Sequence, residues 1–129
     1  MKRAGWILVI ALFATTAFAK DYTVSVSLNW DGKDASGATE ASLPVTFKVY
    51  DASTNQVVSQ GQANGPVNEL ALPSFTISVP DNTTTQKGFY ATATDAAGNV
   101  SERSAIATIN LPGADTLPPA QPVINLIFQ

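Results

Sequence analysis

The feature that most constrains the fold of this chain is a repeated two-residue alternation of apolar and polar side chains. It is clearest over residues 22–30, where Thr, Ser and Asn separate the apolar residues Tyr22, Val24, Val26, Leu28 and Trp30. Every second side chain of a β-strand faces the same way, so this pattern predicts a strand with one buried face.

The same alternation returns along the chain. It predicts further strands over 43–51, 74–80, 89–94 and 104–111. A weaker pattern over 57–63, interrupted by Gly61, predicts a short or edge strand, and residues 64–73 are ambiguous between strand and loop. No segment after residue 19 has helical periodicity. Short strands separated by Gly, Pro, Asn and Asp are typical of an all-β sandwich of about seven strands or of a small barrel.

The segment Asp95 to Asn99 interrupts the alternation between the last two predicted strands. Its Asp-Ala-Ala-Gly-Asn sequence predicts a tight turn, with Gly98 or Asn99 available for a positive φ. Binding residues often lie on loops that connect strands, so Asp95 and Asn99 are candidate contact residues.

Residues 1–19 have the features of a secretory signal peptide. Lys2 and Arg3 precede an apolar run from Trp6 to Phe13, and a small-x-small cleavage site ends at Ala19. We expect export to the periplasm, the cell surface or the extracellular space, with a mature chain over 20–129 and no membrane span after cleavage. The apolar run is short for a span, although an uncleaved anchor is the alternative.

The composition excludes several classes of function. Removing Lys2 and Arg3 leaves five basic and ten acidic residues, a net charge of −5, and the basic residues are scattered, which argues against nucleic acid as a partner. The chain has no Cys and no His. Disulfides, thiol chemistry, thiolate or histidine metal sites and a Ser-His-Asp triad are therefore excluded.

Carboxylates are the remaining candidates for chemistry. Asp31 and Asp34 are close in sequence, but paired acids in a Gly-rich loop are typical of solvated surface. With Asp95 and Asn99 they offer oxygen ligands of the kind that calcium takes, yet the spacing does not match an EF-hand. We expect no catalytic residue, no metal site and no cofactor.

Three segments resemble a bacterial fibronectin type III domain. Residues 24–30 (VSVSLNW) resemble its second strand and residues 45–51 (VTFKVYD) its third. Residues 89–105 (FYATATDAAGNVSERSA) are similar to its sixth strand, the following loop and the start of the seventh. The resemblance implies an immunoglobulin-like antiparallel sandwich over 20–112, with Trp30 in its core, followed by a Pro-rich tail over 113–129.

The chain departs from this family at the start of the sixth strand. The family has a tyrosine there, and the equivalent position, counted back from Asp95, is Phe89. With Phe89 facing inward, Tyr90 points outward, whereas a register shift of one residue would exchange the two faces. Tyr50 and Tyr90 are therefore candidate contact residues on an exposed surface.

The second departure concerns the first strand of the family, which precedes the tryptophan strand. The mature chain begins only two residues before Tyr22, so this strand is missing, while the tail contains a surplus strand-like run. The tail is either a relic or loose extension, or it docks on its own domain, or it adds to a sheet edge of another molecule. Its candidate contact residues are Val123, Ile124, Leu126, Ile127 and Phe128.

The function expected from these features is protein contact. We expect a non-catalytic exported module that mediates adhesion or assembly at the cell envelope, outside the cell or on a virion surface. Its partner would be another protein or, through the tail, a second copy of the chain. The alternative is an accessory module that binds carbohydrate or another surface ligand.

Overall fold

The chain forms seven strands and no helix in the part that the computed structural model describes, which comprises residues 6–15, 20–123 and 125. Within residues 6–15, side chains are described for residues 8–10 alone. The described residues therefore include no helix that could cross a membrane. The strands are β1 (Trp6–Thr15), β2 (Lys20–Trp30), β3 (Val45–Asp51), β4 (Val57–Ala63), β5 (Val67–Val79), β6 (Thr84–Thr94) and β7 (Ala107–Pro112).

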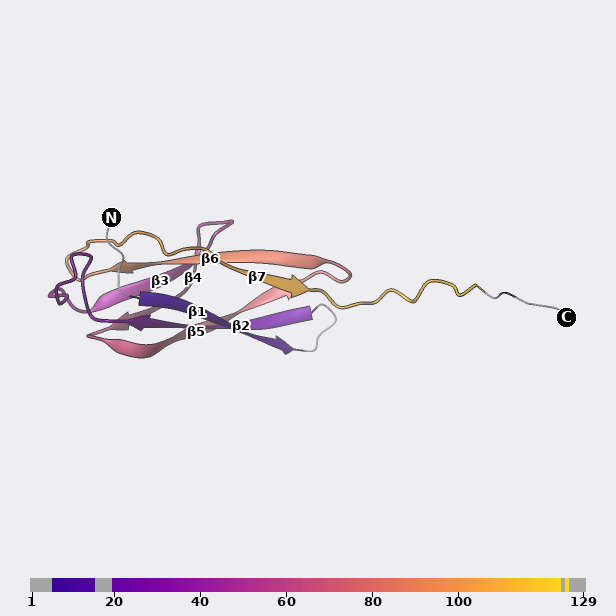
Figure 1. Ribbon diagram of the computed structural model, residues 1–129, viewed down its shortest axis with the longest axis horizontal. Coiled ribbons are helices and arrows are strands. Elements are labelled where there is room, and N and C mark those ends of the chain that lie inside the picture. The colour runs from indigo at the N-terminus through magenta and orange to yellow at the C-terminus, as the bar shows by residue number, and fades with distance from the viewer. Residues whose placement is uncertain (1–5, 16–19, 124, 126–129) are drawn as a thin grey trace.

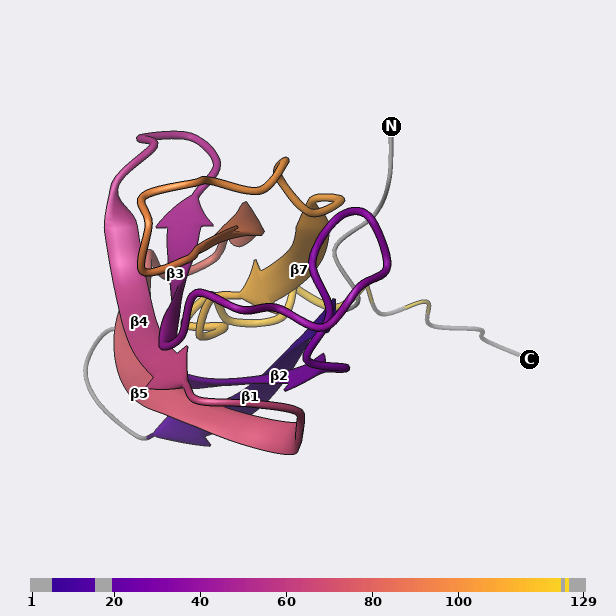
Figure 2. The ribbon, with the colours of Figure 1, turned by 90° about the vertical axis from the view of Figure 1, so that its left-hand side faces the viewer.

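The strands form two antiparallel sheets. One has the order β1-β2-β5 and the other the order β4-β3-β6-β7. Figure 1 shows both sheets running along the long axis, and the end-on view of Figure 2 shows them as two layers. The prediction of an all-β chain of about seven strands is confirmed, and the arrangement is that of a β-sandwich rather than a barrel.

The core lies between the sheets and consists of the residues that the alternation selects. Phe47 and Val49 of β3 and Ala91 of β6 are fully buried. Trp30 is 3% exposed, meets the ring of Phe47 edge-on at 5.7 Å, and donates its Nε1–H to the carbonyl of Lys33. Trp30 is therefore a core residue, as predicted. The inward side chains of β2 are all buried: Tyr22, Val24, Val26, Leu28 and Trp30.

Strand β5 runs through the segment that the sequence left ambiguous. Leu72 and Phe75 of β5 pair with Val26 and Val24 of β2. The two residues of β5 are three positions apart and those of β2 only two, so β5 contains a bulge at this point. Pro73 lies in this bulge, where a missing N–H costs no regular ladder hydrogen bond. A second irregularity lies between Val67 and Leu70, which pair with Trp30 and Leu28. The two irregularities shift the alternation, which is why the pattern over 64–73 was ambiguous.

Strand β7 begins later than predicted. The turn before it is as expected, because Gly98 has a φ of +90° and the N–H of Asp95 donates to the carbonyl of Asn99. Beyond the turn, the hydroxyls of Ser101 and Ser104 accept hydrogen bonds from backbone N–H groups of β6, each at 2.9 Å. These side chains take the place of a regular ladder, so the strand begins only at residue 107.

Strand β1 is the element that the sequence did not predict. Residues Trp6–Thr15, expected to be part of a signal peptide, pair antiparallel with residues 21–30 of β2. Leu8 and Ile10 pack against the core, whereas Val9 between them is 49% exposed. The apolar N-terminal segment is thus an edge strand of the three-stranded sheet. Its removal on export remains a prediction.

Candidate functional site

The candidate site is the edge of β2 that β1 covers. The opposite edge of β2 pairs with β5, so β2 is a central strand only as long as β1 is present. Without β1, residues 21–30 would present a row of unpaired backbone N–H and C=O groups on one side. Such a row is the surface to which an extended peptide adds.

Little in this edge would prevent another strand from pairing with it. After Asp21, the first residue of this edge, residues 22–30 include no charged residue and no Pro, which are two of the devices by which edge strands avoid pairing. The inward positions opposite Leu8 and Ile10 are Leu28 and Val26, both buried. A strand in this position therefore gains main-chain hydrogen bonds and apolar contacts together.

Strand β7 ends beside the start of β2. The hydroxyl of Tyr22 donates a hydrogen bond of 2.7 Å to the carbonyl of Pro112, the last residue of β7. Tyr22 is 7% exposed and belongs, with Val79 and Leu111, to a small apolar cluster at this end of the sandwich. The tail therefore leaves the domain at the end where β2 begins and β1 finishes, as Figure 1 shows.

The first residues of the tail are held to the turn between β5 and β6. The N–H of Gly113 donates to the carbonyl of Thr83 at 2.6 Å, and the N–H of Asn82 donates to the carbonyl of Ala114 at 2.9 Å. The Asn82 side chain also donates to Thr116 Oγ1 and accepts from its N–H, at 2.7 and 2.9 Å. The direction in which the tail leaves is therefore set through Thr116.

The candidate contact residues of the tail lie beyond this anchored part. Val123 is 85% exposed. Ile124, Leu126, Ile127 and Phe128 lie outside the described residues.

The two candidate tyrosines lie together on the outer face of the four-stranded sheet. Their rings stack with centroids 5.0 Å apart and planes at 12°. Tyr90 is only 4% exposed, because Tyr50 and the guanidinium of Arg103, 4.5 Å from the ring centroid, cover it. The Tyr90 hydroxyl donates to Asn55 Oδ1 at 2.9 Å. The outward direction of Tyr90 is confirmed, but the prediction that its side chain is exposed is wrong. Tyr50 is half-buried.

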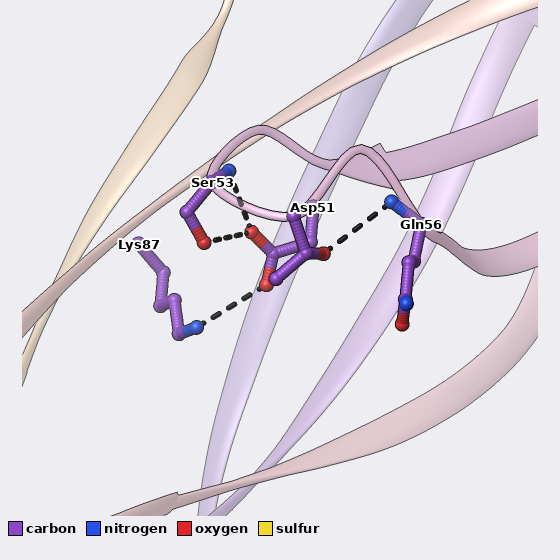
Figure 3. Close-up of polar contacts among 5 residues, drawn as sticks. Asp51, Ser53, Gln56 and Lys87 are labelled. Carbon is purple, nitrogen blue, oxygen red and sulfur yellow. Dashed lines mark hydrogen bonds and ion pairs between the residues drawn. The ribbon is translucent and has the colours of Figure 1, made fainter.

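Asp51 forms a polar cluster beside this pair, at the turn between β3 and β4 (Figure 3). Its carboxylate accepts hydrogen bonds from the N–H and hydroxyl of Ser53, at 2.8 and 2.6 Å, and forms an ion pair with Lys87 of β6 at 3.2 Å. Its N–H donates to the carbonyl of Gln56. Partial burial raises the pKa of Asp51, but Ser53 and Lys87 outweigh it, so the pKa lies below its ordinary value.

Asp95 and Asn99 lie at the opposite end of the domain from the tail, beside a hollow of about 610 Å³. The Asn99 side chain and the N–H groups of Asn99 and Ala97 donate to the Asp95 carboxylate, at 2.9–3.0 Å. These bonds, that of the Asn99 side chain above all, lower the pKa of Asp95. The Asp95 carboxylate therefore stabilises the turn over residues 95–99.

Asp34, in the loop after β2, lines the same hollow. The hydroxyl and N–H of Ser36 and the N–H of Ala38 donate to Asp34 Oδ1, and the Ser36 hydroxyl is the main cause of a lowered pKa. The sequence grouped these two loops only as a source of oxygen ligands for calcium, and the structure places both beside this hollow. Among the described residues, no group of three or more acidic side chains is placed to hold a metal ion. Other residues that line the hollow are Trp30, Glu40, Val100 and Glu102.

Comparison of the chain with protein-family models, with curated proteins and with solved structures found no match.

Proposed function

We propose that this protein is an exported, non-catalytic module of the fibronectin type III kind that works through protein contact at the cell envelope or beyond it. One observation carries the proposal. The segment with the features of a signal peptide is the same segment that completes the three-stranded sheet as β1. Export with cleavage after Ala19 would therefore produce a domain with an open sheet edge.

The order of the strands supports the family assignment within this proposal. The segments that resemble the second, third and sixth strands of the family lie in β2, β3 and β6, and the segment that resembles the start of the seventh strand directly precedes β7. Trp30 of β2 lies in the core, where the resemblance places it.

The chemistry of the open edge favours a protein partner. Removal of residues 1–19 leaves backbone groups of residues 21–30 without protein partners on one side and exposes the core face under Leu8 and Ile10. An added polypeptide strand satisfies the backbone groups and covers the apolar face in one step. We therefore assign protein binding by strand addition to this edge.

The test is to determine whether exported protein lacks residues 1–19. The full chain is expressed in a secreting bacterial host, and intact mass spectrometry of the exported protein should show Lys20 as its first residue. A matched variant with Ala17→Leu and Ala19→Leu should remain unprocessed, because large residues at a small-x-small site block cleavage. Exported wild-type protein that still begins at Met1 would refute the proposal.

A second candidate function, binding of carbohydrate or another surface ligand, is favoured by the hollow at the loop end. Polar side chains from two loops converge there, with Trp30 at its base, and ligand sites commonly combine polar and aromatic groups in this way. Glycan-array binding by the exported protein, lost in Asp95→Ala but kept in Tyr50→Ala, would support this candidate over strand addition.

A further inference from the structure

We propose that the strand that replaces β1 in the processed protein is residues 123–128 of a second copy of the chain. This inference rests on the proposed function, because the position opens only when residues 1–19 are removed. It adds the identity of the partner, the direction of the donated strand and the form of the assembly.

The position left by β1 requires apolar side chains at every second residue. Leu8 and Ile10 fill it opposite Leu28 and Val26, and Val9 between them faces outward. Any replacement strand must reproduce this spacing, because a shift of one residue would turn its apolar side chains to solvent.

The tail has this spacing. With Ile124 at the position of Leu8, Leu126 falls at that of Ile10, and Phe128 continues the same face. Asn125, the polar residue of the run, then falls on the outward face with Ile127. Residues 123–129 carry no charged side chain, as is also true of residues 22–30 of the recipient strand, so pairing buries no charge.

The direction of the tail excludes its own domain as the recipient in this register. The antiparallel position begins beside Trp30, whereas the tail leaves at the other end of β2. In this register Val123 would pair with Asn29. Strand β2 spans about 27 Å from Asp21 to Asn29. The seven steps from the anchor at Thr116 to Val123 span at most about 25 Å when fully extended, and three of the six residues between them are prolines. The tail would also have to reverse direction twice.

A second copy meets the requirement without any reversal. Figure 1 shows the tail leaving along the long axis, away from the end at which β1 begins. If the next copy lies beyond it with its Trp30 end facing the tail, the donated strand enters beside Trp30 and runs antiparallel to β2. The tail of that copy then leaves in the same direction. Each copy donates and receives one strand, and such a head-to-tail contact propagates as a filament.

The experiment uses the full chain, exported and processed by the host, in size-exclusion chromatography coupled to light scattering. Mass spectrometry first establishes the N-terminus. We expect protein that begins at Lys20 to form oligomers. Leu126→Asp, which places a charge on the buried face, should raise the concentration needed for assembly by about tenfold or more. The matched variant Ile127→Asp places the same charge on the outward face and should still assemble.

Each other result overturns the inference in a distinguishable way. Processed wild-type protein that is monomeric, with Leu126→Asp equally stable, refutes strand donation and leaves the proposed function standing. A processed monomer destabilised by Leu126→Asp shows that the tail docks on its own domain, which refutes donation between copies. Unprocessed protein refutes both proposals, because β1 then keeps its position.

A peptide experiment covers the case in which Leu126→Asp fails to accumulate. Processed wild-type protein is refolded from urea with a peptide of residues 117–129. The peptide should occupy the recipient edge and reduce the oligomers to short species, whereas the same peptide with Leu126→Asp should have no effect. Equal oligomer size with and without the wild-type peptide would refute the inference.

Discussion

At the scale of single residues, the carboxylate of Asp51 connects the turn after β3 to strand β6. It accepts two hydrogen bonds from Ser53 and pairs with Lys87. Because the folded state favours the ionised carboxylate, the pKa of Asp51 in the folded protein lies below the ordinary value of 3.8. The stabilisation is therefore complete above that ordinary value and is lost as the pH falls through the lower, folded value.

Asp51→Asn should lower the free energy of unfolding by about 0.5–1 kcal/mol at pH 7, since the pair is partly exposed and screened by solvent. The difference from wild type should shrink in acid, because the wild-type carboxylate is then protonated as well. Urea denaturation at pH 7 and pH 2.5 measures both values. Glu69→Gln, which removes an exposed carboxylate on β5, is the control and should change little at either pH. If Asp51→Asn lowers the free energy of unfolding by the same amount at pH 7 and at pH 2.5, ionisation of Asp51 does not stabilise the fold.

At the scale of elements, β4 and β5 approach each other closely at Gly61. A Cβ atom at this position would lie 2.5 Å from Cδ2 of Leu72, on β5. Gly61 weakened the prediction of β4, because glycine usually interrupts a strand. In the structure, glycine at this position leaves room for the side chain of Leu72 on β5.

Gly61→Ala should destabilise the protein by about 1–3 kcal/mol, because the added methyl group overpacks the contact with Leu72. Gly65→Ala is the matched control, since a Cβ atom there meets nothing within 4 Å, and its effect should stay within about 0.5 kcal/mol. Thermal and urea denaturation of both variants make the comparison. If Gly61→Ala proves as stable as Gly65→Ala, Leu72 has room to move aside.

At the scale of the whole molecule, one sheet of the sandwich has three strands when β1 is present and two when it is removed. A two-stranded sheet of β2 and β5 has few backbone hydrogen bonds between strands. A donated third strand should therefore stabilise the processed domain. When that strand comes from another molecule, folding and association become one equilibrium, and the stability depends on protein concentration.

The midpoint of thermal unfolding of processed protein should therefore rise with protein concentration. Circular dichroism melts over about 100-fold in concentration test this. The processing-blocked variant, with Ala17→Leu and Ala19→Leu, carries its own first strand and should show a constant midpoint. A constant midpoint for both proteins would contradict strand exchange between molecules.

The alternation of apolar residues and the types of the turn residues predicted the strands and the turn, because both depend on residues that are neighbours in the sequence. A strand with one buried face must alternate, so the strands around Trp30 and Phe47 could be found from residue types alone. A positive φ at Gly98 or Asn99 could be predicted because few other residues adopt it, and the structure places it at Gly98. Tyr90 could be assigned to the outward face, but its burial could not be predicted, because Arg103 and Asn55 cover it from distant positions.

The sequence by itself determined the all-β class, the positions of the strands with regular alternation, the turn at residues 95–99 and the core role of Trp30. Each could be inferred from a local pattern of residue types. Only the tertiary structure decided that residues 6–15 pair with β2, that β5 continues through Pro73, and that the loops around Asp34 and Asp95 meet. These depend on which backbone edges and side chains come together between distant segments, and a two-residue alternation does not encode the identity of its partner.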